Sequence, residues 1–250
     1  MGSLTGNLHA LMTMLYTPQL PPAVAVPPAV AVEGGAAAQP QPQPRAPLLR
    51  SAAQMAGCRY KILTEAHAFP SDTYAVKSQL LLHGIDPSHG LVEVAPRPGE
   101  ETLRPEDLLA AIAREGPALA LVLLCGVQYY SGQLFDVRAL TAAGHAAGAV
   151  VGVDLAHAVG NVPLALHEWG VDFAAWCSYK YLNSGPGGIA GLFLHARYAG
   201  DAIGDRPFQA GWWGHVRGSR FKMGGEFVGQ AGAGRLQLSN PPVLQTTALR

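Results

Sequence analysis

Charged residues are scarce in this sequence. Asp, Glu, Lys and Arg make up only 14% of the 250 residues, and 17 basic side chains balance 17 acidic ones. A chain without excess positive charge has no global field that would attract nucleic acid or an anionic membrane. The composition therefore argues against both partners and, with 49% hydrophobic residues, favours a protein with a large buried core.

Cysteines are scarce as well, and Cys58, Cys125 and Cys177 are scattered. Two of them lie in apolar runs, so we expect buried free thiols in a reducing compartment and no disulfide framework. No apolar run approaches the roughly 18 residues that a membrane span needs, and the N-terminus lacks the basic flank of a signal peptide. The histidines show no paired ligand spacing, so no metal site is expected. The expected location is the cytoplasm.

A proline-rich stretch separates the first residues from the rest of the chain. The pattern of residues 8–16 predicts a short amphipathic helix. After it, the sequence PPAVAV occurs twice in succession, at 21–26 and 27–32. Prolines at this density remove backbone donors and favour extended chain, so residues 17–57 are expected to be disordered. The stretch is either a ligand for an SH3-type domain, an insertion or an artefact of gene prediction.

Short apolar strands alternate with helices after the proline-rich stretch. The expected strands are 60–63, 91–94, 119–124, 150–154, 173–178 and 189–194, and the expected helices are 71–83, capped by Ser71 and Asp72, 105–114 and 137–147. Such alternation is typical of a mostly parallel sheet covered by helices on both faces, a three-layer α/β/α fold. Beyond Ala199 the periodicity fades into glycine-rich loop.

Two polar residues follow neighbouring strands of the expected sheet. Asp154 closes one buried run, and Lys180 comes just after the next. In an open α/β sheet, ligands gather at the carboxyl ends of the strands. An acid and a lysine there are the two polar anchors of a pyridoxal-phosphate (PLP) site: the lysine amine forms the Schiff base, and the carboxylate keeps the pyridine nitrogen protonated. Each alone is more often a cap or a surface charge, but together with His157 and Tyr179 they favour a cofactor site.

Weaker signals lie elsewhere in the chain. Thr5, just before the first helix, could offer its hydroxyl and backbone N–H groups to a phosphate. Phe69 could stack on a planar ring, although the sequence alone favours a hydrophobic staple at a helix start. The glycine-rich turn 185–188 could let the backbone pass close to a cofactor. Cys125, at a strand end, is interpreted as a core residue and not a nucleophile.

Taken together, these residues resemble the kynureninases, PLP-dependent hydrolases of the aspartate-aminotransferase fold (fold type I). The resemblance covers the first sixteen residues and about 58–250. It rests on residues 154–161 (DLAHAVGN), 169–173 (WGVDF), 176–183 (WCSYKYLN), 69–72 (FPSD), 211–215 (GWWGH), 220–223 (RFKM) and 239–242 (SNPP). The turn after Asp154 also resembles cysteine desulfurases, which typically carry His where this chain has Tyr179.

The resemblance implies roles in one cofactor and substrate site. Lys180 would carry the Schiff base, Asp154 would hold the pyridinium nitrogen, and Tyr179 would either relay a proton or bind phosphate. Leu4 and Thr5 would bind the phosphate, and Phe69 would stack on the ring with Pro70, Ser71 and Asp72 beside it. His157 would contact the cofactor, as would Cys125, which is often serine in relatives. Trp212 and Asn240 would reach the cofactor across the family dimer, and His215 and Asn240 would contact the substrate.

The implied reaction is hydrolysis of L-kynurenine or 3-hydroxy-L-kynurenine to anthranilate or 3-hydroxyanthranilate plus L-alanine. This is a step of tryptophan catabolism and NAD biosynthesis, carried out by a homodimer. Two alternatives stay open. One is a non-catalytic isoform or interaction subunit that binds partners through the proline-rich stretch or through the exposed half of the dimer surface. The other is a different fold-type-I enzyme such as a cysteine desulfurase.

The resemblance also implies boundaries. Residues 1–16 would begin the PLP-binding large domain, 17–57 would be an insert, and 58–250 would be the truncated remainder of that domain. The family's N-terminal segment, with its Gly-Asn-Ser-Leu-Gly stretch, and its small C-terminal domain would be absent. That domain supplies an arginine for the substrate carboxylate, and losing such a pair costs on the order of 10²–10³ in affinity. The chain alone is therefore expected to be a poor catalyst.

Overall fold

The computed structural model describes residues 2–21, 49–200 and 206–249. In chain order the elements are α1 (Leu4–Leu15), β1 (Lys61–Glu65), α2 (Pro70–Leu82), α3 (Pro87–Gly90), β2 (Leu91–Val94), α4 (Pro105–Glu115), β3 (Leu119–Cys125), α5 (Val137–Ala146), β4 (Val150–Asp154), β5 (Phe173–Trp176), β6 (Gly191–Leu194), the 3₁₀ helices η1 (Ala196–Tyr198) and η3 (Trp212–Gly214), the short helix α6 (Arg217–Arg220), the 3₁₀ helix η4 (Gly232–Leu236) and the short helix α7 (Val243–Thr247). The predicted strands and helices from residue 59 to 194 all form, with ends that differ by a few residues. None of the described helices has the length and apolar character to cross a membrane.

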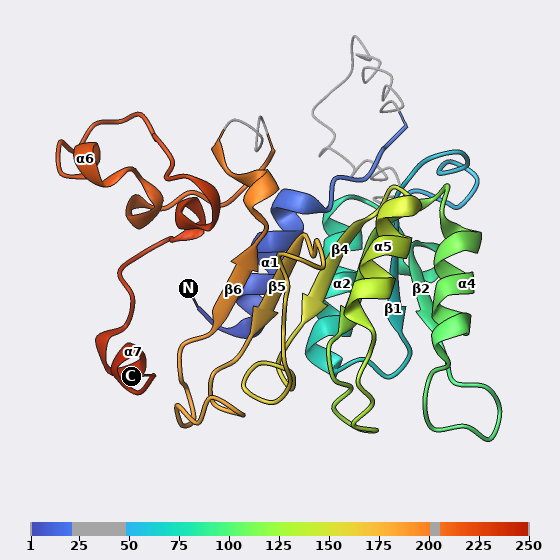
Figure 1. The fold of residues 1–250 in the computed structure, drawn as a ribbon. Coiled ribbons are helices and arrows are strands. Elements are labelled where there is room, and N and C mark those ends of the chain that lie inside the picture. The colour runs from blue at the N-terminus through green and yellow to red at the C-terminus, as the bar shows by residue number, and fades with distance from the viewer. Residues whose placement is uncertain (1, 22–48, 201–205, 250) are drawn as a thin grey trace, which may run out of the picture.

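All six strands form one sheet in the order β2-β1-β3-β4-β5-β6. The first five are parallel, and β6 pairs antiparallel with β5. Helices α1 and α2 pack on one face of the sheet and α4 and α5 on the other, as Figure 1 shows. The predicted three-layer, mostly parallel α/β/α fold is therefore confirmed.

The central strand β3 shows why the sheet needs both helical layers. Its residues are apolar almost throughout, and successive side chains of a strand point to opposite faces. Leu121 and Leu123 join the core under α1 and α2, whereas Val122 and Leu124 join the core under α4 and α5. A strand without a polar face is stable only when it is covered on both sides.

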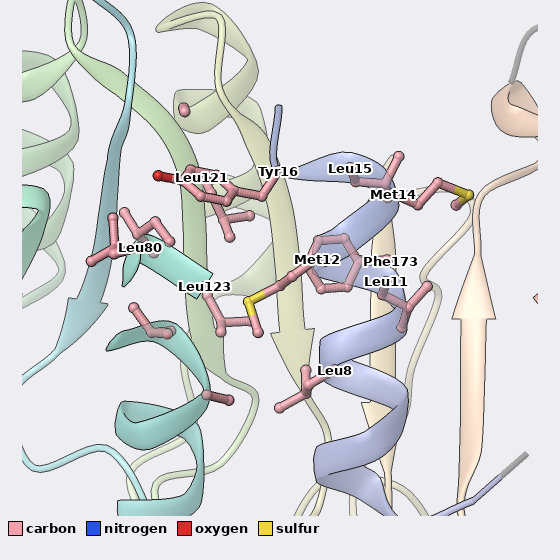
Figure 2. Packing of buried hydrophobic residues seen from close by; sticks show 14 of the residues in the cluster. Leu8, Leu11, Met12, Met14, Leu15, Tyr16, Leu80, Leu121, Leu123 and Phe173 are labelled. Carbon is pink, nitrogen blue, oxygen red and sulfur yellow. The ribbon is translucent and has the colours of Figure 1, made fainter. Parts of the chain in front are cut away.

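One face of helix α1 is buried from Asn7 to Leu15. Leu8, Leu11, Met12 and Leu15 recur at helical spacing and are each 0% exposed. Figure 2 shows these side chains in one cluster with Leu123 of β3 and Phe173 of β5. This packing fixes α1 against the sheet and, with it, the position of the helix's N-terminal turn.

Two helices begin at different residues than the sequence predicted. Helix α1 begins at Leu4 because the Ser3 hydroxyl accepts a hydrogen bond from the backbone N–H of Gly6 (3.1 Å), so Thr5 lies inside its first turn. Helix α2 begins at Pro70, which needs no backbone donor at that position. The prediction that Ser71 and Asp72 cap α2 was therefore wrong, and both side chains are free for tertiary contacts.

Part of the segment predicted to be disordered is folded. Residues 49–57 pack on the domain: Met55 is 1% exposed within the core, and Arg50 forms a bridge with Ile85 and donates a hydrogen bond to the carbonyl of His83 (2.9 Å). Residues 22–48 of the predicted insert lie outside the described residues. All three cysteines are free, as expected, but only Cys177 is fully buried.

Replacing Gly152 with alanine is expected to destabilise the fold by about 1–3 kcal/mol, because overpacking strains a dense core. Gly152 lies in the middle of β4, and a Cβ atom there would stand 2.2 Å from Cζ of Phe173, which is 0% exposed. Urea unfolding of both proteins measures the effect. Gly218→Ala is the control, since a Cβ atom at that position meets no atom within 4 Å. Equal unfolding midpoints for wild type and G152A would contradict the packing.

Candidate cofactor site

Polar side chains gather at the carboxyl edge of the sheet. Glu65, Cys125 and Asp154 end β1, β3 and β4, which are three neighbouring parallel strands. From β1 the sheet grows towards β2 on one side and towards β3 on the other. This edge is therefore a topological switch point, where α/β sheets bind ligands in the crevice between the diverging loops.

A cavity at this edge brings together most of the predicted site residues. It is lined by Leu4, Thr5, Glu65, Phe69, Ser71, Asp72, Cys125, Val127, Tyr129, Asp154, Ala156, His157, Tyr179 and Lys180. Pro70 lies between two of these residues as the first residue of α2. Segments that are far apart in the sequence thus converge on one place, as the resemblance implied.

The N-termini of α1 and α2 meet at this cavity. The Thr5 and Ser71 hydroxyl oxygens lie 2.7 Å apart and form a hydrogen bond that joins the two first turns. The amino end of a helix carries partial positive charge and free backbone N–H groups, both of which favour an anion. The position of Leu4 and Thr5 in the first turn of α1 suits a phosphate better than the predicted position before the helix.

Lys180 lies on a short loop that is closed by two serines. The hydroxyl oxygens of Ser178 and Ser184 are 2.6 Å apart, and the backbone N–H of Ser184 donates to the carbonyl of Ser178 (3.1 Å). The Lys180 amine stands 5.5 Å from the centre of the Phe69 ring, within the range of a cation–π contact. The loop therefore presents the amine beside an aromatic face at the cavity.

Asp154 and Asp72 form a buried carboxyl pair. Asp154 is 5% exposed and accepts a hydrogen bond from the backbone N–H of Ala156 (2.6 Å), and Asp72 is 6% exposed. Burial, and then the neighbouring Asp154 carboxylate, raise the pKa of Asp72 to about 10. Two neighbouring carboxylates cannot both ionise easily in a buried site. Asp72 therefore keeps its proton at neutral pH and donates it in a hydrogen bond to Asp154.

An aromatic wall closes another side of the cavity. The Phe69 and Tyr129 rings meet edge to face with centres 5.3 Å apart, and His157 lies 6.5 Å beyond Tyr129. Burial, and then the positive charge of Lys180, lower the pKa of His157. The imidazole is therefore uncharged at neutral pH, as a group that lies against a flat ligand ring should be.

The site fits the group that the sequence predicted. Oε2 of Glu65 and Oδ1 of Asp72 are buried and lack a hydrogen-bond partner among the described residues, and such atoms normally have one. A ligand that brings hydrogen-bonding groups into the cavity could satisfy them. With Lys180 for an aldehyde, Phe69 for a ring face and two helix N-termini for a phosphate, the donor set matches PLP. Over the described ranges, no three His, Cys, Asp or Glu side chains gather as a metal ion would require.

Four lining residues were missed by the sequence analysis, namely Glu65, Val127, Tyr129 and Ala156. Glu65 could have been found by the rule that found Asp154, but the expected strand ended at residue 63 and the real one ends at Glu65. Cys125, interpreted as core, lines the cavity. Burial raises the pKa of its thiol, which stays protonated and is a poor nucleophile. The glycines of the 185–188 turn do not line the cavity; Gly185 and Gly187 adopt positive φ within the turn.

Three predicted residues lie away from this cavity, in the outlying segment 206–249 that Figure 1 shows beyond β6. The Trp212 indole N–H donates to the carbonyl of Arg220 (3.1 Å). The His215 ring nitrogens contact the Ser219 hydroxyl (2.8 Å) and the backbone N–H of Val228 (3.1 Å). Asn240 is exposed. Their assignment to the site stays a prediction.

Comparison with known proteins gives one consistent result. The aminotransferase class-V family profile matches residues 89–211. A kynureninase from Koribacter versatilis is 58% identical over 192 residues, which are 77% of this chain and 45% of that protein. A kynureninase from Flavobacterium johnsoniae is 55% identical over 244 residues, which are 98% of this chain and 48% of that protein. The chain therefore spans about half the length of the curated relatives it matches.

A solved structure agrees with the fold. A variant of the lyase C-DES, with glycine covalently linked to its PLP cofactor, superposes with a TM-score of 0.60 at 23% identity, over 76% of this chain and 47% of that one. A likeness at this identity supports the fold alone. With the relatives, it confirms the predicted resemblance to kynureninases and to fold-type-I enzymes.

Asp72→Asn should make the free energy of unfolding less dependent on pH. The folded-state pKa of Asp72, about 10, lies above its ordinary value of 3.8. Its contribution to stability is therefore full below pH 3.8 and is lost as the pH rises through the folded-state pKa. An amide does not titrate, yet it can still donate to Asp154.

Urea unfolding at about pH 6 and about pH 9 measures this effect, since the unfolded carboxyl is ionised at both. We expect the free energy of unfolding of D72N, taken relative to that of wild type, to be larger at about pH 9 than at about pH 6. Asp86→Asn is the control, because a hydrogen bond from the Ser88 N–H holds the pKa of Asp86 below its ordinary value, outside this window. A pH-independent difference for D72N would show that Asp72 is ionised throughout.

Proposed function

We propose that this chain, a homologue of the kynureninases, binds PLP on Lys180 and contributes the cofactor half of a hydrolase that cleaves L-kynurenine or 3-hydroxy-L-kynurenine to L-alanine and the matching anthranilate. The observation that carries the proposal is the convergence of Lys180, the Asp72–Asp154 pair and two helix N-termini on one cavity. The identity to kynureninases over this same part of the chain supports it.

Each part of PLP has a counterpart in the cavity. The Lys180 amine would hold the aldehyde carbon, and the first turn of α1, with Thr5 and Ser71, would hold the phosphate. Phe69 would cover one face of the ring, and Asp154 would accept a hydrogen bond from the ring nitrogen. When bound, PLP supplies the electron sink that stabilises negative charge at the substrate Cα.

The carboxyl pair sets the charge at the ring nitrogen. Because Asp72 keeps its proton, the pair carries a single negative charge at neutral pH. That charge matches the single positive charge of a protonated pyridine nitrogen. Asp154 thereby keeps the proton on the nitrogen while Asp72 holds Asp154 in place.

Lys180 and Tyr179 are the residues proposed to accept or donate protons near the substrate. When its amine is not bonded to the cofactor, Lys180 would accept the proton from the substrate Cα. Burial raises the pKa of the Tyr179 hydroxyl, which stays protonated and can donate a hydrogen bond or a proton. Hydrolysis consumes one water, which adds to the γ-carbonyl of the substrate before the Cβ–Cγ bond breaks.

The proposal includes a homodimer in the cytoplasm that acts in tryptophan catabolism and NAD biosynthesis. Trp212, His215 and Asn240 do not line the cavity of their own chain. In the dimer, these side chains from a second copy would complete the site. Such a dimer would account for the family motifs at 211–215 and 239–242, which lie in the segment 206–249 beyond β6.

Capture of PLP should depend on Lys180. Wild-type protein mixed with PLP and reduced with borohydride should carry the cofactor mass on the peptide that contains Lys180, because reduction makes the lysine–cofactor bond permanent. K180A should show no such mass. The control is Lys77→Ala, which removes an exposed lysine of α2 and should leave the modification unchanged. Modification spread over surface lysines, or retained in K180A, would contradict the cofactor assignment.

The product identifies the reaction. PLP-loaded protein supplied with L-kynurenine should release fluorescent anthranilate, and supplied with L-cysteine it should release no sulfide. Because the chain spans about half the length of its relatives, cofactor capture is the primary readout and the turnover rate the second. Sulfide without anthranilate would support a desulfurase. Capture of PLP without either product would support a non-catalytic subunit.

A further inference from the structure

Glu65 is a buried acid of this site for which the proposed mechanism has no role. It is the last residue of β1, it is 2% exposed, and it lines the cavity. Its atom Oε2 has no hydrogen-bond partner among the described residues, and no described basic side chain forms an ion pair with it. A buried acid without a counter-charge is costly to ionise.

The groups that face Glu65 come from three other elements. Cys125 lies beside it at the end of β3, Asp154 lies one strand further at the end of β4, and Asp72 reaches the same place from the first turn of α2. Lys180 is the cation of this group, and it faces Asp72. The cluster therefore holds three carboxyl groups and one amine.

Three ionised carboxylates beside one ammonium would leave two negative charges in a cavity that already has to receive a phosphorylated ligand. Asp72 removes one of these charges by keeping its proton. Burial raises the pKa of Glu65 to about 7, although contact with the Cys125 thiol and with backbone N–H groups lowers it in part. Glu65 is therefore the carboxyl of the cluster whose charge changes near neutral pH.

We propose that Glu65 is a positioning residue for the cofactor: as a neutral acid it packs against Cys125 and limits the strand-end cluster to the single negative charge of Asp154, and its ionisation weakens PLP binding. This inference rests on the proposed function, since PLP is the ligand concerned. Glu65 acts through the carboxyl pair, because an added charge at the end of β1 repels the Asp154 carboxylate and the anionic cofactor alike.

The test compares the PLP dissociation constants of wild type and Glu65→Gln across pH by fluorescence titration. The ratio of the two constants cancels the pH dependence of Lys180, which both proteins share. We expect a ratio near one at about pH 6 and a wild-type affinity about tenfold weaker than that of the variant at about pH 8, one unit above the pKa of Glu65. Glu93→Gln, which removes an exposed acid of β2, should give a ratio near one throughout.

A second variant tests the same inference if Glu65→Gln does not fold. Cys125→Ala removes the thiol that favours the ionised form of Glu65, so the fall in wild-type affinity should move to higher pH. A purely structural Glu65 would change the unfolding free energy of the cofactor-free protein and leave the affinity ratio flat, which would overturn the inference. Failure of wild type to bind PLP at all would instead overturn the proposed function.

Discussion

The parallel pairing of β1, β3 and β4 is the constraint on which the site depends. Cys125 and Asp154 are direct partners in the ladder between β3 and β4, and Glu65 ends the strand on the other side of β3. Parallel strands end at a common edge, so three polar side chains from distant parts of the sequence line one cavity. A slip of one residue in any of these strands would turn its terminal side chain to the opposite face.

The second requirement is that α1 reaches this edge, although residues 22–48 separate it from the strands. Its burial supplies the reason: four apolar side chains at helical spacing leave no exposure, and Asn7 donates a hydrogen bond to the carbonyl of Gly191 (3.0 Å). The helix is thereby fixed against β5 and β6 and lies beside α2, as Figures 1 and 2 show. The bond between Thr5 and Ser71 then joins the two helix N-termini where a phosphate would lie.

The sequence predicted the sheet, its covering helices and the pair Asp154 and Lys180, because these depend on periodicity and on strand ends. It failed where tertiary contacts outweigh local rules. Met55 lies next to a proline-rich stretch, so composition indicated disorder, but its side chain is buried in the core to which α1 and α2 contribute. Ser71 and Asp72 have the residue types of helix caps, yet Pro70 starts the helix and leaves them to contact Thr5 and Asp154.

The buried acids also link stability to binding. Keeping Glu65 and Asp72 out of water with unpartnered oxygens works against folding, since an unsatisfied buried polar group costs about 1–3 kcal/mol. A sheet edge selected for stability alone would carry apolar residues at these strand ends, as β5 does with its apolar FAAW. Under the proposed function, these acids would face a ligand that presents an N–H group at the strand ends and an anion at the helix N-termini. A ligand of that kind stabilises the folded chain when it binds, so the buried acids that weaken the free protein would be the groups that favour the ligand-bound one.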